Sequence, residues 1–332
     1  MIGPSVLIFI LIGVALIFDF LNGFHDSSNI VATMISSRAM SPRVALLMSA
    51  AAHFSAPFLF GVAVAKTIGQ DVVVSEAVTL PVILAASLSA IFWNLFTWWL
   101  GIPSSSSHAL IGGLVGAVGI GFGLQHIQLG GLSKILIALF VSPLLGLIVG
   151  YVNMKLVLFL ARGVSPRINN LFKKLQWFTS LGLALSHGTN DAQKTIGLIT
   201  MGLVATGYLS HFEVKWWVIL LSASAIALGT ASGGWRLIRT LGGKFYKIRP
   251  IHGFTSQLAS TTVIMAAALL GGPVSTTQVV SSSIMGVGSA ERVSKVRWGV
   301  AGNIAVAWLI TIPVSAAMAA LLYHPMTWLM GL

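Results

Sequence analysis

The chain has 332 residues, of which 56% are hydrophobic and only 8% are charged, and its mean hydropathy is +0.93. Soluble domains carry about 25% charged residues, so this composition excludes a soluble globular domain and indicates a membrane protein with several spans. The net charge of +12 comes from basic residues in short loops, a distribution typical of membrane insertion rather than of nucleic-acid binding. The sequence has no cysteine, which excludes disulfide bonds and thiolate metal sites.

The apolar segments approach the ~20 residues that cross a bilayer as a helix, and they show no strand-like alternation. We therefore predict an all-α integral membrane protein rather than a β-barrel. The first apolar run, from Ser5 to about Ser37, lacks a basic start and is too long for a signal peptide. We expect it to remain in the mature protein.

This first run contains the polar motif Asn22-Gly-Phe-His-Asp-Ser-Ser-Asn29 at membrane depth. An ionisable side chain there costs about 3 kcal/mol or more unless a partner, an ion or water compensates it. We therefore predict that the helix is broken near its middle and that Asp26 faces a polar cavity. Asp19, earlier on the same run, is expected to be structural. His25 either relays protons near neutral pH or serves as a neutral polar link.

The pattern returns about half a chain later, in the apolar run from Phe178 to about Tyr208. Its polar motif is Ser186-His-Gly-Thr-Asn-Asp-Ala-Gln-Lys194, in which Gly188-Thr-Asn-Asp191 aligns with Gly23-Phe-His-Asp26. We predict a second broken helix here.

A second pair of motifs repeats in the same order and at nearly the same offset. Pro103-Ser-Ser-Ser-Ser-His108 aligns with Pro273-Val-Ser-Thr-Thr-Gln278. Two such pairs indicate an internal repeat rather than coincidence. Loop charge then predicts orientation, since basic loops remain in the cytoplasm. The basic loops are 38–43, 161–177, 235–250 and 291–297, and the nearly neutral loops are 66–77, 124–134 and 209–215.

Loop 38–43 is thus expected inside, whereas its counterpart 209–215 is expected outside. Halves of opposite topology are typical of many secondary transporters. For the loop charges to fit, Val78–Gly123 must enter and leave from outside, and Phe254–Ser289 from inside. We predict two re-entrant hairpins whose tips lie near the midplane, a position tolerated only where the tips line a cavity or pack on protein. Both termini are predicted outside.

The predicted fold is therefore an inverted-topology repeat with two broken helices and two re-entrant hairpins. Residues 1–160 form the first repeat, in the order broken helix, span, hairpin and span. Residues 161–177 form a basic cytoplasmic linker, and residues 178–332 form the second repeat.

Each hairpin tip consists of a proline, then hydroxyl residues, then a helix of small residues. Proline suits the first helical turn and Ser or Thr the N-cap, and the free N–H groups at such an end favour an anion. We predict that the two tips envelop a tetrahedral oxyanion; the alternative is ordinary capping plus Ser/Thr contacts between membrane helices. His108 and Gln278 either contact the ligand or support residues that do. The predicted substrate-binding residues of the tips are Ser105, Ser106, Ser107, Ser275, Thr276 and Thr277.

The aspartates of the broken helices offer hard oxygen ligands for Na+ or a site for a relayed proton. A cation would also offset the charge of an oxyanion at membrane depth. The alternative for each aspartate is a structural hydrogen bond. Lys194 either pairs with Asp191 or attracts the anion, and pairing is the simpler role. The predicted ion-coupling residues are Asp26, Asn29, Asn190, Asp191 and His25, with Asp26, Asp191 and Asn190 as metal ligands if the ion is Na+. His187 has the same two possible roles as His25.

Serine, histidine and aspartate in these motifs do not indicate a hydrolase. Nothing resembles a nucleophile elbow, consecutive serines point to capping, and no HExxH pattern is present. We predict that the protein is not an enzyme and uses no cofactor beyond a coupling ion, Na+ or H+.

Together the motifs resemble the inorganic phosphate transporter (PiT) family over nearly the whole chain. The resemblance implies phosphate as substrate, symport with Na+ or H+, an inverted-repeat fold and a homodimer. It also implies that Gln193 contacts phosphate or supports residues that do. The Gly-Phe-His-Asp form resembles the bacterial low-affinity, proton-coupled branch, which implies metal–phosphate complexes as a further substrate. The segments that carry the resemblance are Gly23–Thr33, Gly101–His108, Ser186–Gly197 and Gly272–Gln278.

We therefore expect a secondary active transporter of the inner (plasma) membrane that imports inorganic phosphate with a coupling cation by alternating access. One alternative is a symporter of sulfate or another tetrahedral oxyanion. An alternative of another class is an uncoupled anion channel. The expected partners are phosphate, the bilayer and a second copy of the chain, and no nucleic acid.

Overall fold

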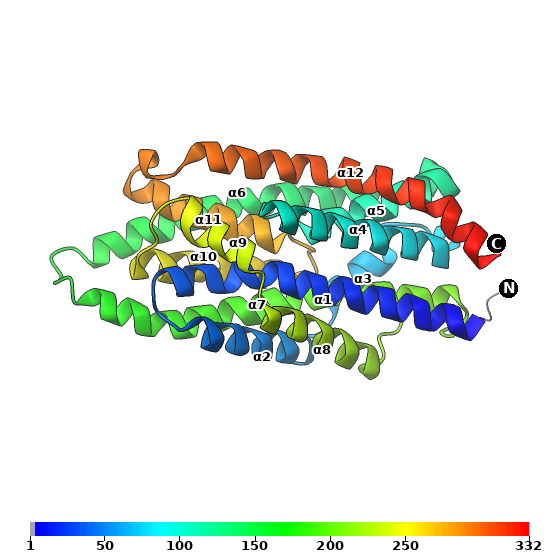
Figure 1. Ribbon diagram of the computed structural model, residues 1–332, viewed down its shortest axis with the longest axis horizontal. Coiled ribbons are helices and arrows are strands. Elements are labelled where there is room, and N and C mark those ends of the chain that lie inside the picture. Colours follow the sequence, from blue (N-terminus) through cyan, green and yellow to red (C-terminus); the bar gives the residue numbers. More distant parts are fainter. Residues whose placement is uncertain (1–3, 332) are drawn as a thin grey trace.

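The computed structural model describes residues 4–331, which fold into twelve α-helices joined by short turns and contain no β-strand (Figure 1). Most helices run along one long axis of the molecule (Figure 1). Five of the described helices are long and apolar enough to cross a membrane, and a sixth span results if α8 and α9 count as one bent helix. The α-helices are α1 Pro4–Ser36, α2 Pro42–Phe60, α3 Ala63–Gln70, α4 Leu80–Leu100, α5 Ser106–Gly121, α6 Leu129–Leu160, α7 Ile168–Ala205, α8 Trp216–Ser232, α9 Trp235–Arg239, α10 Pro250–Leu269, α11 Thr276–Glu291 and α12 Trp298–Met330.

The outer surface is apolar where a soluble protein would be polar. On α12, Leu321 is 78% exposed and Trp328 is 80% exposed, and α6 presents Leu144 and Ile137 in the same way. Large apolar side chains on several helices at once indicate a surface that lies against lipid. The prediction of an all-α, multi-span membrane protein is confirmed.

The prediction that α1 and α7 are broken at their polar motifs is wrong. Both are continuous α-helices, over Pro4–Ser36 and Ile168–Ala205. The expected break would have freed backbone carbonyls to solvate the buried aspartates. Instead, side chains supply the partners of these carboxylates, from α11 in the case of Thr276 and Thr277 and from the same helix in the case of Lys194, so the backbone keeps its own hydrogen bonds.

The helix breaks lie elsewhere, at glycines. α2 ends at Gly61, which has a φ of 80°, and α8 ends at Gly233, which has a φ of 74°. Such left-handed conformations favour glycine because a Cβ atom would be strained there. The chain continues as α3 after the first break and as α9 after the second, where the axis bends by 58°.

Two expected loops are partly helical. The predicted linker 161–177 is irregular only up to Arg167, because α7 begins at Ile168. The predicted loop 66–77 contains the end of α3, which continues to Gln70.

Two helix pairs, α4–α5 and α10–α11, carry the Pro-Ser segments at their turns. α5 packs on α12 and α11 packs on α6. Both contacts are close because of glycines: a Cβ on Gly116 would meet the Ala316 carbonyl oxygen at 2.0 Å, and one on Gly286 would meet that of Leu147 at 2.1 Å.

The two pairs lie in different halves of the molecule's length (Figure 1). α4–α5 occupies the half in which α1 begins and α12 ends, and α10–α11 occupies the half that contains loop 161–167. The turns of the two pairs face each other near the middle. That the two pairs are re-entrant stays a prediction.

Candidate functional site

The turns of both helix pairs have the same local structure. Ser105 is the N-cap of α5, and its hydroxyl accepts a hydrogen bond from the His108 amide at 3.2 Å. Ser275 is the N-cap of α11 and accepts one from the Gln278 amide at 3.4 Å. Side-chain caps of this kind fix where each helix starts, so the next two hydroxyl residues point out of the helix end.

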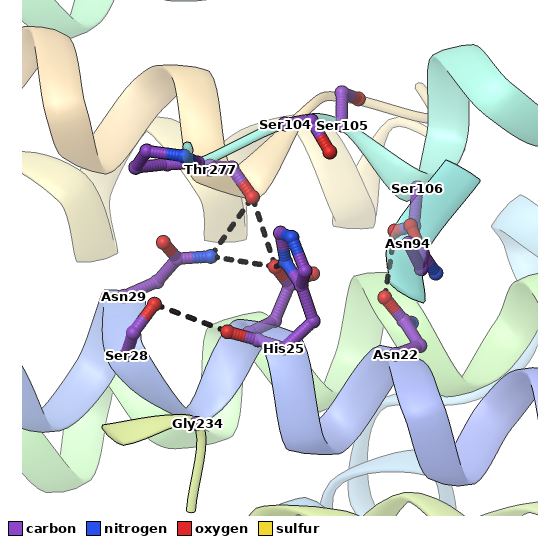
Figure 2. A network of polar contacts seen from close by, with 12 residues as sticks. Asn22, His25, Ser28, Asn29, Asn94, Ser104, Ser105, Ser106, Gly234 and Thr277 are labelled. Atoms are coloured by element: carbon purple, nitrogen blue, oxygen red, sulfur yellow. Dashed lines mark hydrogen bonds and ion pairs between the residues drawn. The ribbon is translucent and has the colours of Figure 1, made fainter. Parts of the chain in front are cut away.

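The α11 tip contacts both polar motifs. Thr277 donates to the Asp26 carboxylate at 2.9 Å and accepts from the Asn29 amide at 3.0 Å (Figure 2). Asn29 also donates to Asp26, at 3.0 Å. Thr276 donates to the Asp191 carboxylate at 3.1 Å. The N-terminal end of α11 therefore contacts both Asp26 and Asp191, the aspartates of the two repeated motifs.

The α5 tip lies beside it, on the same face of α1 (Figure 2). Ser106 donates to the Asn22 side chain at 2.6 Å and accepts from the Lys194 ammonium at 3.4 Å. Ser107 donates to the backbone carbonyl of Val274, in the other tip, at 3.3 Å. The two tips therefore meet, and α1 and α7 lie against both of them.

The two carboxylates differ in their surroundings, although both are fully buried. Both oxygens of Asp191 are engaged, by Lys194 at 2.5 Å and by His187 at 2.8 Å together with Thr276. Asp26 directs all its hydrogen bonds through Oδ1, and its Oδ2 has no partner among the described residues.

The two histidines lie next to the carboxylates. Nδ1 of His25 is 3.1 Å from Asp26 Oδ1, and its Nε2 is 3.4 Å from the Thr97 hydroxyl. Asn29 donates to Nε2 of His187 at 3.4 Å, and Nδ1 of His187 lies 2.8 Å from Oδ2 of Asp191. Ligand atoms of Asp26, His187 and Asp191 all lie within 4.8 Å of one another.

Two other predicted residues have partners at the edges of this cluster. Asn190 donates to the Gly272 carbonyl at 3.3 Å, and its side-chain oxygen has no partner in the described structure. Gln193 donates to the Gly61 carbonyl at 2.8 Å and accepts from the Ala65 amide at 3.1 Å. The structure thus places Gln193 at the break between α2 and α3, where it satisfies backbone groups.

The sequence interpretation missed three buried polar residues near the cluster. His53 on α2 stacks on His187, with ring centroids 5.2 Å apart, and its Nδ1 is 2.7 Å from the Thr230 hydroxyl. On α4, Thr97 bonds to Ser104 at 2.8 Å, and Asn94 is buried with neither amide atom paired within residues 4–331. Each is a polar residue inside an apolar run, which is the signal that could have identified it.

A separate ion-pair cluster joins the outer ends of α10 and α11. Glu291 accepts from Arg249 and Lys295 and lies 2.9 Å from Nε2 of His252. Partial burial alone would raise the pKa of Glu291, but the hydrogen bonds from His252 and Lys295 outweigh it and lower the pKa to about 2. Glu291 therefore stays ionised at neutral pH and links the two arms of the pair.

Hydroxyls, carboxylates and an ammonium buried at the centre of an apolar helix bundle define a class: a membrane transport protein for small ions. A family model described as the phosphate transporter family matches residues 22–319. The chain belongs to this phosphate transporter family.

Among its relatives, a probable low-affinity inorganic phosphate transporter of Rhizobium meliloti is 46% identical, over 94% of this chain and 94% of the relative. One of the same description from Bacillus subtilis is 42% identical over 93% and 94%. A solved structure described as the sodium-dependent phosphate transporter is 24% identical and covers 98% of this chain and 99% of its own, with a TM-score of 0.87. That likeness shows a shared fold.

Proposed function

We propose that this protein is a symporter that imports inorganic phosphate across the inner membrane with a coupling cation, by alternating access. The observation that carries the proposal is the meeting of two N-capped helix ends with two buried carboxylates at one place in the bundle. The names of the relatives support phosphate as the substrate.

The helix ends offer what a tetrahedral oxyanion needs. Each end presents backbone N–H groups and the positive end of a helix dipole, and the hydroxyls of Ser106, Ser107, Thr276 and Thr277 lie between them. Thr276 and Thr277 now donate to Asp191 and Asp26. We infer that phosphate enters by exchanging these hydroxyl–carboxylate hydrogen bonds for hydroxyl–phosphate ones.

The exchange would leave the carboxylates in need of other partners, and this couples phosphate to a cation. The unpaired Oδ2 of Asp26 and the unpaired side-chain oxygens of Asn29 and Asn190 are candidate ligands. A bound Na+ or proton would replace the lost hydroxyl donors and offset the charge of phosphate. Binding of the cation then raises the affinity for phosphate, and binding of phosphate raises the affinity for the cation, as symport requires.

Alternating access in this proposal moves the two helix pairs in turn. The two pairs carry matching motifs and face each other from opposite halves, and their tips contact α1 and α7 through side-chain hydrogen bonds that a ligand could replace. An inverted repeat over residues 1–160 and 178–332, re-entrant hairpins, termini outside the cell and a homodimer complete the proposed arrangement.

Uptake by purified protein in liposomes tests the proposal. Labelled phosphate should accumulate above its outside concentration when a Na+ or H+ gradient is imposed, and the gradient that drives it identifies the coupling ion. Unlabelled sulfate should compete weakly. Equilibration without accumulation would instead indicate an uncoupled channel, preferential uptake of sulfate would indicate another oxyanion transporter, and no uptake under any gradient would contradict the proposal.

A further inference from the structure

Asp26 and Asp191 occupy equivalent positions in the two repeated motifs, but their side chains have different hydrogen-bond and ion-pair partners. Asp26 contacts neutral donors, Asn29 and Thr277, together with His25. Asp191 contacts the ammonium of Lys194, one helical turn further along α7. The residue that aligns with Lys194 in the first motif is Asn29, so only the second motif carries its own cation.

The side chain of Lys194 is fixed by its contacts. It is fully buried, and its ammonium contacts both the Asp191 carboxylate, at 2.5 Å, and the Ser106 hydroxyl, at 3.4 Å. A buried ammonium needs a compensating charge, and Asp191 supplies it. The ammonium therefore sits between the carboxylate and the α5 tip.

The lysine ammonium occupies the place next to one oxygen of that carboxylate. It contacts Oδ1 of Asp191 at 2.5 Å, and His187 and Thr276 contact Oδ2, so both oxygens already have partners within the protein. At the first motif, Oδ2 of Asp26 remains open. A second cation beside Asp191 would also be repelled by Lys194 at close range.

We propose that Lys194 is a tethered counter-cation, which permanently fills the place beside Asp191 that a coupling cation would otherwise occupy, so that a coupling cation binds only at the Asp26 end. This inference rests on the proposed symport function. It assigns different roles to two residues that the repeat makes look alike: Asp191 holds a fixed charge pair beside the phosphate, and Asp26 holds the exchangeable ion.

A variant without the ammonium tests the assignment, because a small free cation should then take its place. The melting temperature of purified Lys194→Ala should rise by more than that of the wild type when Na+ or ammonium replaces choline at constant ionic strength and without phosphate. Choline is too large to enter the vacated volume. The gain beyond that of the wild type should disappear in the double variant Asp191→Asn/Lys194→Ala, since no carboxylate remains at position 191 to hold the ion.

Lys194→Arg and Lys155→Gln are the matched controls. The first keeps a cation, and the second removes an exposed lysine of α6, so both should show the wild-type response to the three salts.

If Lys194→Ala does not purify, Lys194→Gln gives the same comparison with less lost volume. A salt response of the neutral variant equal to that of the wild type, or an unchanged extra gain in the double variant, would overturn the proposal. Phosphate uptake by the wild type is measured separately, so failure of symport and failure of this assignment are distinguishable.

Discussion

The Thr277 hydroxyl donates a hydrogen bond to the Asp26 carboxylate at 2.9 Å, although 251 residues separate the two in the chain. Thr277 belongs to the tip of α11 and Asp26 to the middle of α1. This contact joins a helix end proposed to bind the anion to a carboxylate proposed to bind the coupling ion, so a substitution at either residue should alter the binding at the other.

Thr277→Val should weaken phosphate transport while the protein stays folded. The substitution keeps the shape but removes the donor to Asp26 and the acceptor for Asn29. A hydrogen bond to a charged group contributes about 1.5–3 kcal/mol, so we expect the phosphate concentration for half-maximal uptake to rise about tenfold or more. Uptake by proteoliposomes measures it.

The matched control is Thr262→Val on α10, an exposed threonine whose hydroxyl donates to its own helix at Leu258. It should leave uptake unchanged. Equal kinetics in Thr277→Val and the control would remove Thr277 from the site.

Asp26→Asn should uncouple transport from the cation gradient. The amide has nearly the same size but no charge, so it binds a cation far more weakly. We expect accumulation driven by a gradient to fall at least about tenfold, since losing one partner of a buried charge interaction costs about 2–5 kcal/mol. Exchange of labelled for unlabelled phosphate across the liposome, which needs no net gradient, measures what remains. Gradient-driven accumulation at the wild-type rate would contradict the assignment of Asp26.

Gly286→Ala should destabilise the protein because α11 approaches α6 too closely for a methyl group. A Cβ there would lie 2.1 Å from the Leu147 carbonyl oxygen, which is backbone and cannot turn aside. Overpacking of this kind typically costs about 1–3 kcal/mol. Thermal unfolding in detergent measures the loss.

Gly302→Ala on α12 is the comparison, since an added Cβ meets nothing within 4 Å. Removing a glycine from an open helical position should leave stability unchanged or raise it by up to about 1 kcal/mol. If Gly286→Ala and Gly302→Ala had the same melting temperature, α6 and α11 would lie too far apart for the added methyl group to clash.

Acid should loosen the outer end of the α10–α11 pair. Hydrogen bonds lower the pKa of Glu291 from its ordinary value of 4.5 to about 2. A carboxylate with a depressed folded-state pKa contributes stability that is fully present above 4.5 and is lost as the pH falls toward 2. The melting temperature of the wild type should therefore drop over this range by more than that of Glu291→Gln. Parallel pH profiles of the two proteins would contradict this role.

The sequence alone predicted which segments meet. As predicted, the repeated Pro-Ser turns lie against the repeated motifs around Asp26 and Asp191. Polar groups inside apolar segments need hydrogen-bond partners, and other polar groups of the protein supply them. The all-α membrane class followed from composition in the same way.

What failed was the location of the helix breaks. The motif around Asp26 is predicted to unwind because it places ionisable side chains at membrane depth. The helix stays continuous because Thr277, from the far end of the chain, pairs with Asp26. The actual breaks at Gly61 and Gly233 had a signal, glycine within an apolar run, but glycine is also common inside membrane helices. The asymmetry created by Lys194 was visible in the sequence, whereas its contact with Ser106 depends on how α5 and α7 pack.

The most direct test of the account is an experimental structure of the protein in lipid nanodiscs with saturating phosphate. We predict tetrahedral density between the tips of α5 and α11, within hydrogen-bonding distance of Ser106 and Thr276, and a longer distance between Thr277 and Asp26 than the present 2.9 Å. Phosphate density elsewhere in the bundle, with the hydrogen bonds from the tips to Asp26 and Asp191 unchanged, would contradict it.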